Sequence, residues 1–430
     1  MEITISHNLH LVSSSLGLKQ QKAWIKPEPR RAGFLSTVLV TLLRMLHPRR
    51  KPRISFTFGR HETVIYSERF ASQLAKVFPE KDARIFDPFL RAEVFILELS
   101  VACFLWLFRR RNWTISDYYF YLVLKKSRAS HVVTSVLANR SIFRVREALP
   151  QKSPTRFFFF QTGMIWLDEV PQDMGLRPQD RLFTYSTSYS DAWRISDPHH
   201  LDVVHAIGSL PSVIEKATAR SRQRCSSGKV GFISSWREPL TLGGNEVKLN
   251  RVTLQPISYE FWFSPERRLL PHLAESLQQM GLRLEVLGSM LSETQKAQSE
   301  RDFYSSFLGD NVDWKFSSRT SQLSNYGKLS GYDLLVAVDS ALAYEALSLG
   351  FKVIFLQLEE TKGFRFPPGY PGVDSCLKPL VLNAENPHVW QEHLLKVIEM
   401  PEKEFRGVVE SSLGREVVEA QLEDIIRRIR

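Results

Sequence analysis

The stretch from Asp333 to Leu356 constrains the fold of this chain more than any other part of its sequence. It begins with an apolar run, passes through the turn Asp339-Ser340 into a small-residue segment that ends at Gly350, and closes with a second apolar run. The first run, residues 334–338, does not alternate with polar residues, which is typical of a strand buried on both faces of a parallel sheet. The stretch therefore predicts one β-α-β unit with a polar corner after its first strand.

That corner has the composition of a phosphate-binding turn. Ser340 lies where a helix N-cap is expected. The backbone N–H groups of Ala341, Leu342 and Ala343 would then be free at the positive end of the helix dipole. Because the side chains there are small, a ligand could approach the backbone.

The helix after the corner has two predicted faces. Leu342, Ala346 and Leu349 share one face and are expected to pack on the sheet, whereas Tyr344 and Glu345 share another. Glu345 is therefore expected to be a carboxylate about one turn above the phosphate site.

The 430 residues are enough for two domains, because single hydrophobic cores stop growing near ~250 to 300 residues. Strand-like and helix-like segments alternate in both halves, which predicts α/β architecture with two doubly wound, Rossmann-like domains facing a central cleft. The expected strands cover residues 53–58, 83–86, 131–135, 156–160, 201–207, 230–233, 282–287, 312–316 and 334–338. The expected helices cover 67–78, 91–108, 115–127, a segment from 139, 264–281, and segments after 386 that close on an amphipathic helix over 417–429.

The expected domain organisation follows from this alternation. A basic, partly apolar extension covers 1–51, a first α/β domain 52–215, a second α/β domain 216–400, and C-terminal helices 401–430. The charged and polar run within 210–228 marks the linker.

Polar residues follow the predicted strands at the edge where ligands of parallel sheets bind. They are Ser135, Asn139, Gln161, Thr162, Gly163, Gly208, Ser209, Ser234, Ser235, Asp339 and Ser340. The three Ser-bearing turns at 208–209, 234–235 and 339–340 would converge on one phosphorylated ligand, and Arg237 would pair with a diphosphate. Taken singly, such a turn is more often an ordinary loop start or helix cap.

Positive charge is concentrated at the N-terminus. Residues 1–60 hold eleven Lys or Arg against two Glu, so they supply +9 of the net charge of +11. The apolar segment 33–46 is flanked by basic residues and is too short to span a bilayer. Residues 19–53 would bind an anionic membrane surface as a basic amphipathic segment, or form a leader and a helix docked on the first domain. Nucleic acid is a distant third partner, because no nucleic-acid-binding motif accompanies the charge.

A second apolar stretch, residues 92–108, ends in an Arg triplet. Glu93 and Glu98 lie within it, and a carboxylate in the bilayer costs a few kcal/mol, so a core helix is favoured over a membrane span.

The sequence lacks the motifs of several common enzyme classes. The sequence has no Gly-rich ATP loop, no dinucleotide-binding turn, no G-x-S-x-G and no zinc-protease spacing. The three Cys residues are far apart, which excludes a disulfide framework and favours the cytoplasm. His199, His200 and His205 are close in sequence, but strand geometry would separate them, so surface roles are favoured over metal binding.

A strand, the motif D-S-x-x-x-Y-E-A-x-x-x-G and a second strand follow one another in this chain. This order resembles the donor-site unit of bacterial surface-polysaccharide biosynthesis proteins of the two-domain GT-B glycosyltransferase type, and of the related capsule and teichoic-acid transferases. It is most similar to the O-antigen biosynthesis proteins, in which a strand ending in Gln-x-Gly, an Ile-Gly-Ser turn and a Ser-x-x-x-Tyr-Glu-Ala helix occur in this order. Here these are residues 161–163, 207–209 and 340–346, and the likeness covers roughly residues 52–400. The family pattern often has Thr-Leu-Gly after the Ser, where this chain has Ala341-Leu342-Ala343, which leaves the donor open.

The resemblance implies transfer of a sugar from a nucleotide-sugar donor to a surface polysaccharide or glycolipid acceptor, without a metal or other cofactor. Ser340 and the following N–H groups would hold the diphosphate, Glu345 the ribose hydroxyls, and Arg237 would offset charge on the leaving nucleotide. The implied donor-side residues are Ser340, Ala341, Leu342, Tyr344, Glu345, Ser235, Arg237, Gly208 and Ser209. The implied acceptor-side residues, in the first domain, are Asn139, Gln161, Thr162 and Gly163.

The general base remains open among four candidates near predicted strand ends, which are His61, Glu62, Asp87 and Asp191. Two other functions also remain open. One is a nucleotide-sugar epimerase or polyol-phosphate transferase of similar fold, and the other is a non-catalytic scaffold in polysaccharide assembly. The expected location is the cytoplasm, peripherally on the inner face of the cytoplasmic membrane.

Overall fold

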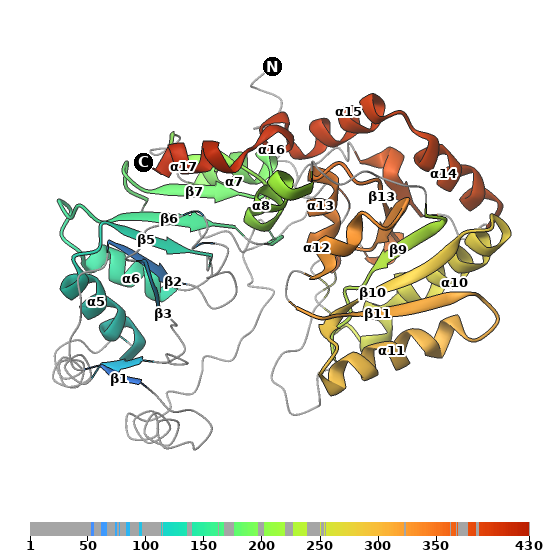
Figure 1. Cartoon of the computed structure of the whole chain (residues 1–430), viewed down its shortest axis with the longest axis horizontal. Coiled ribbons are helices and arrows are strands. Elements are labelled where there is room, and N and C mark those ends of the chain that lie inside the picture. The colour runs from blue at the N-terminus through green and yellow to red at the C-terminus, as the bar shows by residue number, and fades with distance from the viewer. Residues whose placement is uncertain are drawn as a thin grey trace. The chain divides into compact units, whose positions relative to one another are not determined.

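A computed structural model describes the chain from residue 53 to residue 429 with gaps (Figure 1). Before 115, the described residues are 53–55, 62–66, 74, 77, 83–86, 94–96 and 113. They continue over 115–135, 140–161, 163–166, 176–196, 202–219, 227–238, and 250–429 without 251–252, 254, 322–323, 362, 367, 369–376 and 384–386. The chain forms two compact units, divided at Ile214–Glu215 and again at Glu419–Ala420.

The first unit is built on a six-stranded parallel sheet. In spatial order its strands are β3 (Ala83–Phe86), β2 (Thr63–Tyr66), β5 (His131–Thr134), β6 (Arg156–Phe160), β7 (Arg181–Thr184) and β8 (Val204–Ala206). All neighbours in this sheet pair in parallel. Two further strands, β1 (Arg53–Ser55) and β4 (Val94–Ile96), pair with each other in a separate parallel ribbon.

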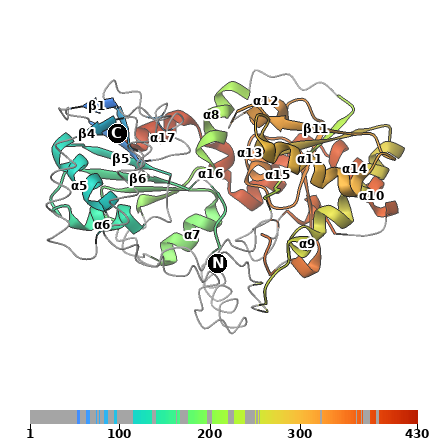
Figure 2. The ribbon, with the colours of Figure 1, turned by 90° about the horizontal axis from the view of Figure 1, so that it is seen from below.

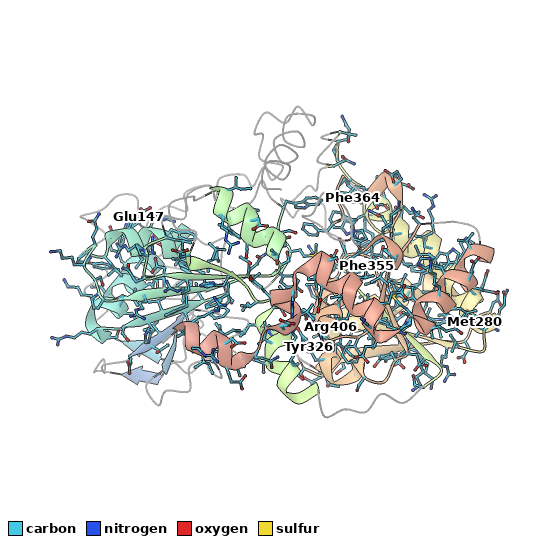
Figure 3. All side chains as sticks on the ribbon, turned by 90° about the horizontal axis from the view of Figure 1, so that it is seen from above. Glu147, Met280, Tyr326, Phe355, Phe364 and Arg406 are labelled. Atoms are coloured by element: carbon cyan, nitrogen blue, oxygen red, sulfur yellow. The ribbon has the colours of Figure 1, made fainter. Side chains whose placement is uncertain are left out.

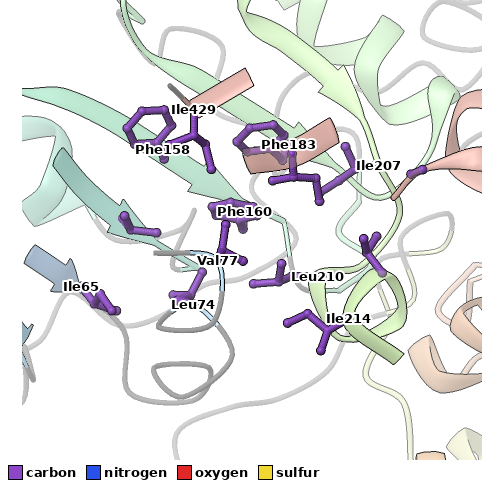
Figure 4. Close-up of a cluster of buried hydrophobic side chains, with 14 residues drawn as sticks. Ile65, Leu74, Val77, Phe158, Phe160, Phe183, Ile207, Leu210, Ile214 and Ile429 are labelled. Atoms are coloured by element: carbon purple, nitrogen blue, oxygen red, sulfur yellow. The ribbon is translucent and has the colours of Figure 1, made fainter. Parts of the chain in front are cut away.

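Helices cover both faces of the first sheet. The helices of this unit are α5 (Ile115–Ser127), α6 (Arg140–Ala148), α7 (Thr187–Ser196) and α17 (Leu422–Ile429). Helix α8 (Leu210–Ala219) crosses the division, and its residues 210–214 belong to this unit. On one face Phe159 of β6 stacks on Phe143 of α6, with ring centroids 5.6 Å apart. On the other face Phe158 and Phe160 join a buried apolar cluster with residues of α8 and α17 (Figure 4). Since strand side chains alternate between faces, the aromatic run of β6 serves two cores.

The last helix of the chain belongs to the first unit. Ile425 and Ile429 of α17 are buried in the cluster beside Phe158 and Phe183 (Figure 4). The amphipathic helix expected over 417–429 is therefore two helices, α16 (Arg415–Glu419) and α17, and the unit boundary lies between them.

The second unit is built on another six-stranded parallel sheet. In spatial order its strands are β11 (Trp314–Arg319), β10 (Arg283–Leu291), β9 (Lys229–Ile233), β12 (Leu334–Ala337), β13 (Val353–Leu356) and β14 (Val381–Leu382). Numbered along the chain, this order is 3-2-1-4-5-6, which is the order of dinucleotide-binding Rossmann sheets. The predicted α/β architecture with two doubly wound, Rossmann-like domains is confirmed, and β11 is an edge strand.

Helices of the second unit also lie on both faces. They include α9 (Tyr259–Trp262), α10 (Ser264–Gln279), α11 (Gln295–Leu308), α12 (Ser324–Leu329), α13 (Ala341–Ser348), α14 (Pro387–Glu399), α15 (Glu402–Leu413) and α16. Phe232 of β9 packs on Tyr304 of α11, and Phe355 of β13 packs on Tyr344 of α13. Register places Phe232 and Ile354 on the same face, so Phe355 points the other way and α11 and α13 cover opposite faces. Figure 2 shows α10 and α14 side by side.

Several elements differ from their prediction. Val94–Ile96 is a strand, although residues 91–108 were expected to be helical, and β-branched and aromatic side chains favour strands there. The strands β2 and β7 and the helices α7, α8 and α11 were not expected. Helix α10 ends at Gln279, two residues before the end expected at 281, and Phe263 is its N-cap.

None of the helices among the described residues is long and apolar enough to cross a membrane. The basic extension over 1–51 and most of 92–108 lie outside the described residues.

Candidate functional site

The carboxyl ends of β9 and β12 form the topological switch point of the second sheet. Here the chain order reverses, and nucleotides bind Rossmann sheets in the crevice at this place. Ile233 pairs with Ala337, so both strands end at the same level. Ser234 and Ser235 follow β9, and Asp339 and Ser340 follow β12. Two of the three predicted Ser-bearing turns therefore meet at one edge of one sheet.

A buried arginine, Arg365, joins these two turns. Its Nε and Nη2 atoms donate to the two carboxylate oxygens of Asp339, each at 2.8 Å. Nη2 also lies 2.8 Å from the hydroxyl of Ser235 and 2.9 Å from a carboxylate oxygen of Glu266 on α10. Nη1 donates to the carbonyl oxygen of Trp262 at 2.9 Å. One guanidinium thus links the β9 turn, the β12 turn and α10.

The charges of this cluster are shielded from water. The side chain of Arg365 is 2% exposed and that of Glu266 is 0% exposed. Burial raises the pKa of Glu266, against the opposing effect of Arg365. Burial alone would lower the pKa of Arg365, but Asp339 and Glu266 outweigh it and hold that pKa above its usual value. Arg365 therefore stays charged and acts as the counterion of two carboxylates.

Aromatic rings cover the guanidinium. Its central carbon lies 5.4 Å from the ring centroid of Trp262 and 5.8 Å from that of Phe263, both within cation–π range. Phe364 (Figure 3) packs on Trp262 and on the exposed Phe261, with ring centroids 5.5 and 5.2 Å apart. These rings lower the local dielectric and so strengthen the ion pairs.

Ser340 is the N-cap of α13, as predicted. Its backbone has φ −73° and ψ 132°, and its side chain makes no capping hydrogen bond. The N–H of Ala343 donates to the carbonyl of Ser340 at 3.0 Å. The prediction of three free N–H groups at 341–343 is therefore wrong at Ala343, because the first turn of the helix is tight.

Helix α13 buries more than the predicted face: Ala346 is buried as expected, and the face that carries Tyr344 and Glu345 is buried as well. Tyr344, Glu345 and Ser348 are buried, whereas Leu342 and Leu349 are partly exposed. Glu345 is 6% exposed, and one of its carboxylate oxygens accepts a hydrogen bond from the hydroxyl of Tyr326 on α12 (Figure 3 labels Tyr326). The predicted ribose carboxylate is therefore paired with a neighbouring helix.

A second buried carboxylate organises the ends of β9 and β10. Glu300 of α11 accepts from the N–H of Ser289 at 2.7 Å, from the N–H of Met290 at 2.9 Å and from the hydroxyl of Ser234 at 2.5 Å. The hydroxyl of Tyr304 donates to Ser234 at 2.8 Å. Glu300 thus fixes the level at which the two strands end.

One polar atom at this edge is left without a partner. Asn325 of α12 is 5% exposed, and its Nδ2 donates to the carbonyl of Gly288 at 3.2 Å. Its Oδ1 is buried, and no described residue hydrogen-bonds to it. A buried acceptor of this kind costs about 1–3 kcal/mol when unpaired, and a ligand N–H or O–H group would remove that cost.

The remaining donor-side residues have ordinary surroundings. Arg237 is exposed, and its carbonyl accepts from Tyr259 at 3.0 Å. Ser209 caps α8, since its hydroxyl accepts from the N–H of Ser212 at 3.2 Å. Gly208 before it has φ 81°, a conformation that glycine adopts at little cost. Both Gly208 and Ser209 lie in the first unit, so their place in a site with the two turns of the second sheet stays a prediction.

The acceptor-side prediction falls partly outside the described residues. Gln161 is buried. Its amide nitrogen Nε2 donates to the carbonyl of Gly163 at 2.9 Å, and its Oε1 accepts from the N–H of Tyr185 at 3.2 Å. Its amide therefore holds the backbone at the carboxyl end of β6. Asn139 and Thr162 lie outside the described residues.

Two of the four candidate bases are described. Glu62 is exposed and directly precedes β2, at the amino edge of the first sheet, away from the carboxyl edge. Asp191 is on α7 and pairs with Arg194 at 3.2 Å on the surface. His61 and Asp87 lie outside the described residues.

His205 has its pKa lowered to about 4 by burial and by Arg428, whose Nη1 lies 2.9 Å from its Nδ1.

Among the described residues, no group of three or more His, Cys, Asp or Glu side chains could hold a metal ion. Sequence reasoning missed Arg365, Glu266, Glu300 and Asn325. The only sequence signal at Arg365 is a lone cation between two aromatic residues, Phe364 and Phe366.

Comparison with known proteins gives a family and a fold. A family model described as "putative O-antigen biosynthesis protein" matches residues 176–423, more than half of the chain. The crystal structure of a UDP-N-acetylglucosamine 2-epimerase, described as putative, from Listeria monocytogenes is similar in fold. Its TM-score is 0.51 at 10% identity over 86% of this chain and 96% of that one.

Two further solved structures have lower scores. MnaA of S. aureus, solved with UDP, has a TM-score of 0.49 at 11% identity, over 88% of this chain and 96% of that chain. The wall teichoic acid polymerase TagF has a TM-score of 0.47 at 12% identity, over 85% of this chain and 88% of that chain. None of the curated proteins matches the sequence.

Proposed function

The chain belongs to the family of O-antigen biosynthesis proteins, and from this membership we propose that it is a glycosyltransferase that uses a nucleotide-sugar donor. The acceptor in this proposal is a surface polysaccharide or a glycolipid. Such a transfer needs a site for a nucleoside diphosphate and, separately, a site for an acceptor hydroxyl.

One observation carries the proposal. The turn Asp339-Ser340 lies at the switch point of a sheet with the 3-2-1-4-5-6 order, beside Ser235 on the neighbouring strand. The backbone of this turn opens α13, whose dipole favours an anion. Residues from α12, α10 and the loop around 365 brace the same edge, so the turn is fixed before a ligand arrives.

In the proposed reaction, Ser340 and the first N–H groups of α13 hold the diphosphate. The anionic nucleotide is the leaving group, so donors at this place stabilise charge that grows in the transition state. Arg237 is exposed after β9 and would add a cation at the same edge. Glu345 would bind the ribose only after its carboxylate leaves Tyr326 or shares its hydrogen bond with it.

Nucleotide binding tests this proposal directly. We expect UDP-, GDP- or CMP-sugars to raise the melting temperature, because a ligand at 100 times its dissociation constant adds ~2.7 kcal/mol. Ser340→Ala should weaken binding about tenfold, and Glu345→Gln by a similar factor, as expected for loss of one hydrogen bond to a charged or polar partner. Isothermal titration calorimetry measures both changes.

Matched controls separate binding from folding. Ser348→Ala makes the same substitution at the other end of α13 and should leave affinity unchanged. Tyr326→Phe removes the hydroxyl that pairs with Glu345 and should retain or improve binding. Absence of binding by the wild-type chain to all three nucleotide classes would disprove the donor site.

A labelled donor identifies the reaction class. Label in a glycan indicates a glycosyltransferase, an inverted free nucleotide-sugar indicates an epimerase, and a phosphodiester product indicates a polyol-phosphate transferase. Nucleotide binding without turnover on any acceptor would instead favour a scaffold role.

We also propose that the basic extension places the enzyme on the inner membrane surface. Each Lys or Arg near an anionic surface contributes about 1 kcal/mol. Deleting residues 1–51 should therefore abolish cosedimentation with vesicles that contain phosphatidylglycerol and leave nucleotide affinity intact. Equal cosedimentation of the full and shortened chains would rule out the extension as the anchor.

A further inference from the structure

All three nitrogen atoms of the Arg365 guanidinium donate hydrogen bonds within the protein. Nε, Nη1 and Nη2 all donate, and their acceptors come from three segments far apart in the sequence: Ser235, the pair Trp262 and Glu266, and Asp339. Such a group is not available to bind a ligand directly. Any role it has in ligand binding must act through the residues it holds.

The partner of Arg365 that bears most directly on a phosphate site is Asp339. It directly precedes Ser340, the N-cap of α13. A free carboxylate at that place would itself be attracted to the helix N-terminus and would repel a phosphate there. In the structure both oxygens of Asp339 are bonded to Arg365, in the two-pronged geometry that guanidinium and carboxylate favour.

The same guanidinium also fixes the neighbouring turn. Its Nη2 atom lies 2.8 Å from the hydroxyl of Ser235, and that hydroxyl lies 3.2 Å from Glu266. The two turns that border the switch point are therefore held to one buried group. The unpaired Oδ1 of Asn325, on α12 beside Gly288 of the adjacent strand β10, independently indicates that this edge has an unmet hydrogen-bond requirement.

This inference rests on the proposed nucleotide site. We propose that Arg365 is a positioning residue that allows the β12–α13 turn to bind phosphate. It neutralises Asp339 and ties the Asp339-Ser340 turn to Ser235. A purely structural ion pair would stabilise the fold but would give no charge-specific effect on ligands.

The two partners of the ion pair then differ in their effect on an anionic ligand. Arg365→Met leaves Asp339 uncompensated beside the phosphate, so affinity should fall at least tenfold, about 1.4 kcal/mol. Asp339→Asn removes the negative charge while its amide oxygen can still accept from Arg365, and Glu266 remains as the counterion. Affinity for the same ligand should then stay equal or rise, up to about threefold, or about 0.65 kcal/mol. Both substitutions are expected to lower the melting temperature.

The experiment uses the full chain. The ligand is whichever of UDP, GDP and CMP raises the wild-type melting temperature most, and the control ligand is the corresponding uncharged nucleoside. Calorimetry gives both affinities for the wild type, Arg365→Met, Arg365→Lys and Asp339→Asn. Arg365→Lys keeps the charge but loses the two-pronged contact, so it should fall between the wild type and Arg365→Met. If Arg365→Met does not fold, Arg365→Lys should still lose nucleotide affinity whereas Asp339→Asn should not.

Loss of nucleotide affinity in Arg365→Met with equal or higher affinity in Asp339→Asn, and nucleoside affinity constant within about twofold, would establish the role of Arg365. Parallel losses in both variants, or equal effects on nucleotide and nucleoside, would overturn it and leave the proposed function standing. If the wild type binds none of the three nucleotides, the proposed function fails and this role of Arg365 fails with it.

Discussion

Deletion of residues 420–430 is expected to unfold the first unit while the second unit remains folded. The deletion removes α17, whose Ile425 and Ile429 are 0% and 5% exposed and pack in the core with Phe158 and Phe183. Truncating one buried isoleucine to alanine costs about 2–5 kcal/mol, and a whole domain is stable by only about 5–15 kcal/mol. Losing two such side chains and the partly buried Leu422 and Ile426 exhausts that stability.

Hydrogen exchange resolved by peptide measures this effect. Peptides of β6 and α8 should lose protection in the deletion variant, whereas peptides of β9 and β12 should keep it. Ile425→Ala should give a smaller loss of the same pattern. Arg427→Ala is the matched control on the same helix, because Arg427 is 80% exposed and should be neutral. Unchanged protection of β6 after the deletion would mean that the core does not need α17.

A comparably large effect is expected from Asp180→Ala in the first unit. Asp180 is fully buried and accepts from Nε of Arg146 at 2.8 Å, from the N–H of Arg177 at 2.8 Å and from the N–H of Phe157 at 3.0 Å. The substitution removes the carboxylate that pairs with a buried guanidinium and that accepts from two backbone N–H groups. Breaking a buried ion pair on one side costs about 3–5 kcal/mol. Urea denaturation should show a loss of that size.

Two further variants show whether the cost is due to the charge left behind. Burial lowers the pKa of Arg146 and Asp180 opposes this, so removing both charges in Arg146→Met with Asp180→Asn should recover part of the loss. Asp191→Ala removes a carboxylate from the surface pair with Arg194 and should cost no more than about 1 kcal/mol. Equal losses for Asp180→Ala and Asp191→Ala would contradict the buried-charge account.

The fold was predictable wherever local sequence and tertiary environment agree. The run at 334–338 is apolar without alternation because β12 is a central strand covered on both faces, and that burial is visible in the sequence. Strand β7 was missed because Arg181–Thr184 is short and follows a polar loop. Helix α11 was missed because its segment is rich in polar residues, although Phe303 and Tyr304 anchor it.

The candidate site was only half predictable for a different reason. Ser340 follows an apolar strand and precedes small helix formers, so its N-cap position is a local property. Arg365 is separated from Asp339 by 26 residues and from Ser235 by 130, and its role arises only when three distant segments meet. The burial of the second face of α13 was missed because a helical wheel does not show that Tyr326 of α12 pairs with Glu345.

The division of the chain at Ile214 and Glu419 has a consequence for biosynthesis. The described residues of the first unit lie within 53–214 and 420–429, so the second unit, at 215–419, is in effect an insertion between them. Because a chain is made from its N-terminus, the ribosome releases the last isoleucines of the first unit only after the whole second unit has been made. The domain begun first is finished last, and an apolar sheet face stays uncovered in the meantime. A nascent chain stalled before residue 420 should therefore recruit a chaperone through the first unit.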